Sequence, residues 1–116
     1  MYQKLIIIGN LGRDPEMRYT PDGKPNTTFS VATSRKAGDK DETTWFRVSV
    51  WGNQAEPCNQ YLRKGSKVLV EGLLKSEINV YQRKDGSYAA SYDVMADTVR
   101  FLSGKDEPAV TDEVPF

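Results

Sequence analysis

The chain has no histidine and only one cysteine, Cys58, among its 116 residues. A single cysteine cannot form an internal disulfide, and without histidine a zinc site is not expected. The absence of histidine also removes the commonest general base and so weakens an enzymatic interpretation. No hydrophobic run approaches a membrane span, and the first residues lack the features of a signal peptide. We therefore expect one globular domain in the cytoplasm, with no cofactor or metal.

Charge is unevenly distributed, although the net charge is zero. Residues 1–104 hold 15 Lys and Arg side chains against 12 Asp and Glu, whereas residues 105–116 hold one lysine against four acids. A mildly basic body favours a polyanionic partner. A solvated surface followed by a disordered end explains the same counts.

The spacing of apolar residues predicts short strands with one helix between them. Strands are expected at residues 4–9, 26–34, 43–52 and 67–75, followed by a hairpin over residues 77–102 that turns at 84–86 and leads into the last strand. Gly72 is expected to form a bend or bulge. Residues 11–24 are expected to form turns, and residues 35–42 a mobile hairpin loop.

The helix is predicted over residues 53–65, with Pro57 in its first turn and Gly65 as its C-cap. Three strands, one helix and two further strands follow the order of an OB-fold. This all-β, five-stranded barrel has one helix between strands three and four. The predicted barrel domain covers residues 1–102. Residues 103–116 lose all periodicity and are expected to be a short, flexible acidic tail.

The segment TTWFRVSVWG (43–52) has two different faces as a strand. Phe46, Val48 and Val50 form a core face, and the opposite face carries Trp45, Arg47, Ser49 and Trp51. Aromatic rings beside a cation are typical of surfaces that bind single-stranded nucleic acid, because bases stack on the rings while Lys and Arg contact phosphates. Alternatively, the tryptophans pack under a loop or are covered by a second subunit.

Tyr81 repeats this arrangement near the tip of the last hairpin, where Arg83 and Lys84 follow it. The alternative is a simple cross-strand pair between Tyr81 and Tyr88.

Several stretches resemble the bacterial single-stranded DNA-binding protein (SSB) family, and together they cover nearly the whole chain. They are residues 4–23, 29–34, 43–52 and 61–72 and the terminal DEVPF; GNLGRDPE together with YLRKG and VEG is the most specific part. The resemblance implies an OB-fold, a homotetramer and wrapping of single-stranded DNA. It also implies that bases stack on Trp45, Trp51 and Tyr81.

The resemblance places Lys4, Lys64 and Lys75 near the DNA backbone, although each is equally well explained as an ordinary surface lysine. Family members often stack a base on an aromatic residue in the first hairpin loop, where this chain has Ala37. Arg35 and Lys36 beside it would compensate only electrostatically.

The end of the chain also resembles the family, whose acidic tip binds replication, recombination and repair enzymes. The tip residues are Asp112, Glu113, Val114, Pro115 and Phe116. Because about ten residues separate Phe101 from this tip, its reach is limited. The tip either recruits partners over a short range or folds back onto the basic groove.

These observations predict a non-catalytic, nucleoid-associated protein that binds and protects single-stranded DNA without sequence preference. The alternative is an OB-fold accessory subunit that buries its tryptophans against a protein partner. An enzyme is disfavoured, because the sequence shows no nucleophile–base pair, phosphate-binding glycine loop or metal cluster.

Overall fold

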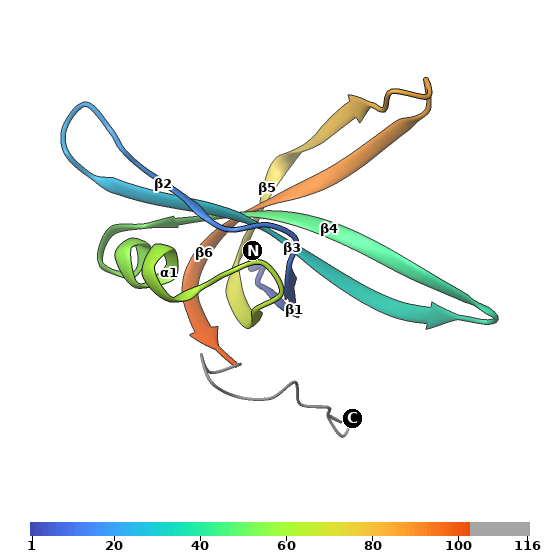
Figure 1. Cartoon of the computed structure of the whole chain (residues 1–116), viewed down its shortest axis with the longest axis horizontal. Helices are drawn as coiled ribbons and strands as arrows, with labels where there is room; N and C mark the ends of the chain where they lie inside the picture. The colour runs from blue at the N-terminus through green and yellow to red at the C-terminus, as the bar shows by residue number, and fades with distance from the viewer. Residues whose placement is uncertain (103–116) are drawn as a thin grey trace.

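A computed structural model describes residues 1–102 of the chain, so the predictions for residues 103–116 lie outside the described residues (Figure 1). The strands are β1 (Leu5–Leu11), β2 (Glu16–Tyr19), β3 (Pro25–Ala37), β4 (Lys40–Trp51), β5 (Lys67–Gln82) and β6 (Tyr88–Phe101). Between β4 and β5 lie the 3₁₀-helix η1 (Gly52–Gln54) and the α-helix α1 (Ala55–Tyr61). No helix within residues 1–102 is long and apolar enough to cross a membrane.

Five of these strands close into a barrel. They hydrogen-bond in the order β1-β5-β6-β4-β3, and β3 returns to β1 through the pairs Asn10–Ala32 and Leu11–Val31. The β4–β6 pairing is parallel, while β1–β5, β5–β6 and β3–β4 are antiparallel. A closed five-stranded barrel with its helix between the third and fourth barrel strands confirms the predicted OB-fold.

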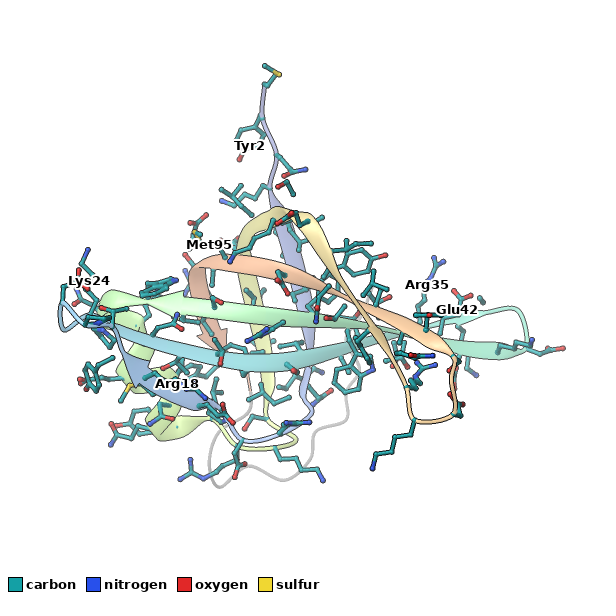
Figure 2. All side chains as sticks on the ribbon, turned by 90° about the horizontal axis from the view of Figure 1, so that it is seen from above. Tyr2, Arg18, Lys24, Arg35, Glu42 and Met95 are labelled. Carbon is teal, nitrogen blue, oxygen red and sulfur yellow. The ribbon has the colours of Figure 1, made fainter. Side chains whose placement is uncertain are left out.

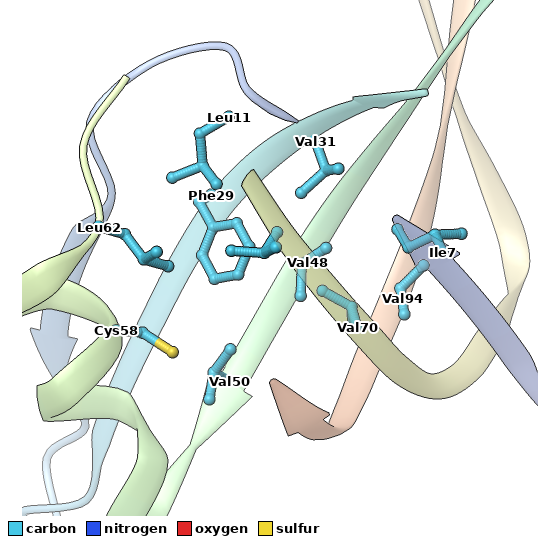
Figure 3. Packing of buried hydrophobic residues seen from close by; sticks show 11 residues of the cluster. Ile7, Leu11, Phe29, Val31, Val48, Val50, Cys58, Leu62, Val70 and Val94 are labelled. Atoms are coloured by element: carbon cyan, nitrogen blue, oxygen red, sulfur yellow. The ribbon is translucent and has the colours of Figure 1, made fainter. Parts of the chain in front are cut away.

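The barrel core consists mainly of β-branched residues from alternating strand positions (Figure 3). Val48 and Val50 are fully buried, as the alternation of β4 predicts, whereas Phe46 is only partly buried and its ring lies 5.8 Å from that of Tyr92. Cys58 of α1 closes one end of the core, and burial raises the pKa of its thiol to about 11. The helix is held against β3 because the hydroxyl of Thr27 donates a 2.6 Å hydrogen bond to the carbonyl of Ala55.

Two segments predicted as turns or loops are partly strand. Residues 11–24 contain β2, which pairs with the first residues of β3; a strand of four residues gives too little alternation to detect. Residues 35–42 form a hairpin as predicted, but β3 and β4 extend to a turn at Gly38 and Asp39, so most of the expected loop is strand. Oppositely charged residues face each other there, Arg35 across from Glu42 and Lys36 across from Asp41, and such pairs stabilise a hairpin.

The helix is shorter than predicted, although Pro57 does lie in its first turn. It ends at Tyr61 because Leu62 adopts an extended conformation (ψ 147°) and buries its side chain in the core. Gly65 therefore belongs to the following turn and is not the C-cap. Its N–H group donates to the carbonyl of Leu11 at 2.8 Å, which ties this turn to the end of β1.

Two long hairpins, β3–β4 and β5–β6, project from the barrel in different directions (Figure 1). β5 is one long strand with register shifts after Glu71 and Leu74, which confirms the bulge expected at Gly72. The second hairpin turns at Lys84, Asp85 and Gly86 as predicted. There the Ser87 hydroxyl and N–H both donate to the Asp85 carboxylate, and these hydrogen bonds lower the pKa of Asp85.

Candidate nucleic-acid interface

The outward face of the sheet formed by β3, β4 and β6 carries the predicted aromatic and cationic residues of β4. Trp45 and Trp51 are 40% and 44% exposed, and Arg47 between them is also exposed. Their cross-strand neighbours on β3 are Ala32, Ser30 and Asn26, opposite Trp45, Arg47 and Trp51 respectively. Small and polar neighbours leave both indoles and the guanidinium open to a ligand.

Three adjoining hollows follow this face. The largest, about 460 Å³, brings Trp45 and Arg47 of β4 together with Tyr81 of β5. It is also lined by Gly12, Arg13, Ser30, Phe46, Asn79 and Ser91. Two smaller hollows of about 200 and 150 Å³ continue past Arg13 toward Arg18 and Asn26. Because Arg47 lines all three, they form one groove, and Trp51 lies beside its Asn26 end by register.

The position of the Trp45 ring depends on Gly12, in the loop after β1. A Cβ atom at Gly12 would lie 2.6 Å from Cζ3 and 2.8 Å from Cη2 of the indole, closer than carbon atoms approach. The Gly12 N–H donates to the carbonyl of Ser30 at 3.0 Å, so β3 holds the loop in place. The indole is therefore supported along one edge by backbone while it stays exposed to the groove.

Tyr81 enters the groove from the second hairpin and is 43% exposed. Its cross-strand partner is Ala89, whereas Tyr88 lies opposite Gln82. The alternative of a direct Tyr81–Tyr88 pair is therefore wrong. With alanine opposite it, the Tyr81 ring has free space on its face of the hairpin.

The model of the Single-strand binding protein family matches residues 2–102. The chain belongs to this family. A single-stranded DNA-binding protein of Neisseria meningitidis serogroup A is 41% identical over 109 residues, which cover 90% of this chain and 62% of the relative. One from Helicobacter hepaticus is 38% identical, and the match covers 100% of this chain and 68% of the relative. One from Chlamydia muridarum is 40% identical, and the match covers 88% of this chain and 64% of the relative.

This member of the single-strand binding protein family thus spans about three fifths to two thirds of the length of these relatives. Family membership agrees with the OB-fold of the barrel. Within residues 1–102, no group of three or more His, Cys, Asp and Glu side chains is placed to hold a metal ion.

The other predicted cations of this family member are spread more widely. Lys64 lines a shallow hollow that adjoins the groove near Gly12 and Arg13, and its N–H donates to the Asp14 carboxylate at 2.8 Å. Arg35 lies toward the far end of the β3–β4 hairpin, 3.3 Å from the Glu42 carboxylate (Figure 2). Five further predicted cations do not line the three hollows: Lys4, Lys36, Lys75, Arg83 and Lys84.

Sequence reasoning missed two groove arginines, Arg13 and Arg18, which flank the hollows from the β1–β2 loop and from β2. Both fall in the stretch interpreted as turns, so no face was assigned to them. Glu16 and Arg18 alternate with the partly buried Met17, but a strand of four residues is too short for this alternation to reveal a face from the sequence. Asn79 and Ser91 were also missed. They hydrogen-bond to each other across β5 and β6 at 3.4 Å.

Proposed function

We propose that this protein binds single-stranded DNA without sequence preference and without catalysing a reaction. The observation that carries the proposal is the groove in which Trp45, Arg47 and Tyr81 line one hollow. Nucleobases stack on Trp45, Trp51 and Tyr81, while Arg13, Arg18 and Arg47 contact phosphates. The printed names of the relatives, single-stranded DNA-binding proteins, support the same activity.

Two terms supply the affinity. Base stacking on aromatic side chains contributes about 1–3 kcal/mol per base, a range that comes from single-strand binding proteins themselves. Release of counterions supplies the rest, with a salt slope of about −0.7 for each phosphate neutralised. Trp45 and Trp51 are six residues apart on one strand, roughly 20 Å, so they meet different nucleotides.

Tryptophan fluorescence tests the proposal directly, because both tryptophans border the groove. Titration with oligo-dT should strongly quench the emission, and added salt should reverse the quenching. If the tryptophans instead serve a protein interface, oligo-dT leaves the emission unchanged. That result would refute DNA binding in this groove.

We further propose that the protein is a homotetramer, with two surfaces that support it. Along β1, Leu5 to Gly9 pair with β5 on one side, and within residues 1–102 the only β3 partners of β1 are those of Asn10 and Leu11. An open strand edge favours antiparallel pairing with a second copy. The outward face of β1, β5 and β6 carries Ile6, Ile8, Leu73 and Met95, all exposed. An edge contact and a face contact together build a tetramer from two dimers.

A charge on this apolar face should break the tetramer. Ile8→Asp places a carboxylate where the face contact would exclude water, so the mass measured by light scattering should fall to that of a dimer or monomer. Val80→Asp, at an exposed aliphatic position on the β5–β6 hairpin, is the matched control and should keep the mass of the wild type. If the wild type and both variants all have the mass of a tetramer, the subunit interface does not include this apolar face.

We also propose that the terminal residues recruit replication, recombination and repair enzymes. Their acidic and apolar side chains suit a basic pocket with an apolar floor. Deletion of residues 112–116 should abolish capture of such enzymes from an extract. Binding of oligo-dT should persist or tighten, because the negative charges of Asp112 and Glu113 are removed. Continued capture by the truncated protein would exclude this role.

A further inference from the structure

A carboxylate lies within the proposed DNA-binding face. Asp93 of β6 is the direct cross-strand neighbour of Arg47 in the parallel β4–β6 ladder. Residues paired in this way project to the same face of a sheet, so Asp93 shares the outward face of Arg47. One of its oxygens, Oδ1, is buried and has no hydrogen-bond partner within residues 1–102.

The missing partner separates Asp93 from the other acids of this region. Glu16 lies 3.8 Å from Arg18, Asp14 accepts the N–H of Lys64, and Glu42 pairs with Arg35. Buried acceptors in proteins almost always have a donor, and a buried charged oxygen without one is costly. Oδ1 of Asp93 therefore has no donor among the protein groups of residues 1–102.

Arg47 is the cation placed to supply that donor. The two residues are adjacent across neighbouring strands, which lie about 4.8 Å apart, and an arginine side chain easily spans this gap. Within residues 1–102, Arg47 forms no ion pair of 4.0 Å or less; its side chain instead lines the three hollows. Its guanidinium has five N–H donors in a planar fork and can serve two acceptors at once.

We propose that Asp93 is the positioning residue of Arg47 in the DNA complex, an inference that rests on the proposed function. When DNA covers this face, water leaves and the unpaired carboxylate becomes more costly. Arg47 then donates to Asp93 with one edge of its guanidinium and to a phosphate with the other. Asp93 thereby fixes the cation in the middle of the groove, although it is itself negative.

The sign of the effect distinguishes positioning from simple repulsion. A carboxylate that only repels DNA weakens binding, so its removal tightens binding whatever residue stands at position 47. A carboxylate that positions Arg47 strengthens binding. Its removal therefore weakens binding, but only while Arg47 is present.

The experiment is a double-mutant cycle on oligo-dT affinity, measured by anisotropy of labelled dT over a range of salt concentrations. Asp93→Asn keeps the shape and removes the charge, and it should weaken binding about five- to tenfold. In an Arg47→Met background the same substitution should cost nothing or tighten binding slightly. Asp93→Glu should retain most of the affinity. Asp97→Asn on the same strand removes an equal charge away from Arg47 and should not weaken binding.

A second measurement needs no variant. In labelled wild-type protein, the Nε–H resonance of Arg47 should shift and become protected from solvent exchange when dT is added. Three results would overturn the inference. They are tighter dT binding by the Asp93→Asn protein, an equal loss of dT affinity from Asp93→Asn in the wild-type and Arg47→Met backgrounds, and an Arg47 resonance that stays unprotected in the complex. If the wild type does not bind dT at all, the proposed function itself is wrong. That outcome differs from the three results above, in each of which the wild type still binds dT.

Discussion

Replacement of Trp45 by alanine should weaken oligo-dT binding by about 1–3 kcal/mol, or roughly 5- to 150-fold. The ring is 40% exposed and lies outside the buried core, so the fold should survive its removal. Anisotropy of labelled dT measures the affinity without relying on protein fluorescence, and thermal melting checks the fold. We expect a similar loss for Trp51→Ala.

Two further variants separate stacking from packing. Gly12→Ala keeps the indole but pushes it aside, because the new Cβ would meet Cζ3 and Cη2; it should reduce affinity less than Trp45→Ala. Tyr88→Ala removes an aromatic ring that is 71% exposed and does not line the three hollows, and it should bind dT as the wild type does. Unfolding of the Trp45→Ala protein would show that the ring serves packing.

Gly72→Ala should strongly destabilise the barrel. The new Cβ would meet the backbone of β6, where the carbonyl of Met95 and the Cα of Ala96 lie, and neither can move without breaking the β5–β6 ladder. We expect a loss of about 3 kcal/mol in the free energy of unfolding. Urea denaturation followed by circular dichroism measures it.

Ser76→Ala, at an exposed position further along β5, is the matched control. Its urea midpoint of unfolding should equal that of the wild type within experimental error. A Gly72→Ala protein as stable as this control would show that β6 bends away freely at the bulge.

The sequence predicted the barrel well because its strands carry long alternations. Val48 and Val50 alternate with exposed Arg47 and Trp51, and this pattern requires no knowledge of the partner strands. The same local pattern indicated the aromatic face of the groove. The bulge at Gly72 was also predictable, because a glycine inside a strand marks a place where another backbone comes close.

The parts that could not be predicted depend on contacts between distant segments. Residues 35–42 look like a loop until the register sets Arg35 opposite Glu42. The helix ends early because Leu62 is needed in a core that the helix sequence does not reveal. Arg13 joins the groove only because the chain folds the β1–β2 loop beside β4. The sharing of one hollow by Trp45 and Tyr81 likewise depends on how β5 and β6 pair.

One guanidinium, that of Arg47, borders every hollow of the groove. In the proposed DNA complex, a phosphate that steps from one hollow to the next keeps the same cation as its neighbour. We therefore expect a strand to move by one nucleotide, exchanging stacked bases, without first releasing this charge contact, and the protein to diffuse along DNA. The proposed complex is then held and mobile at once, and we expect another protein that advances on the same strand to displace it gradually.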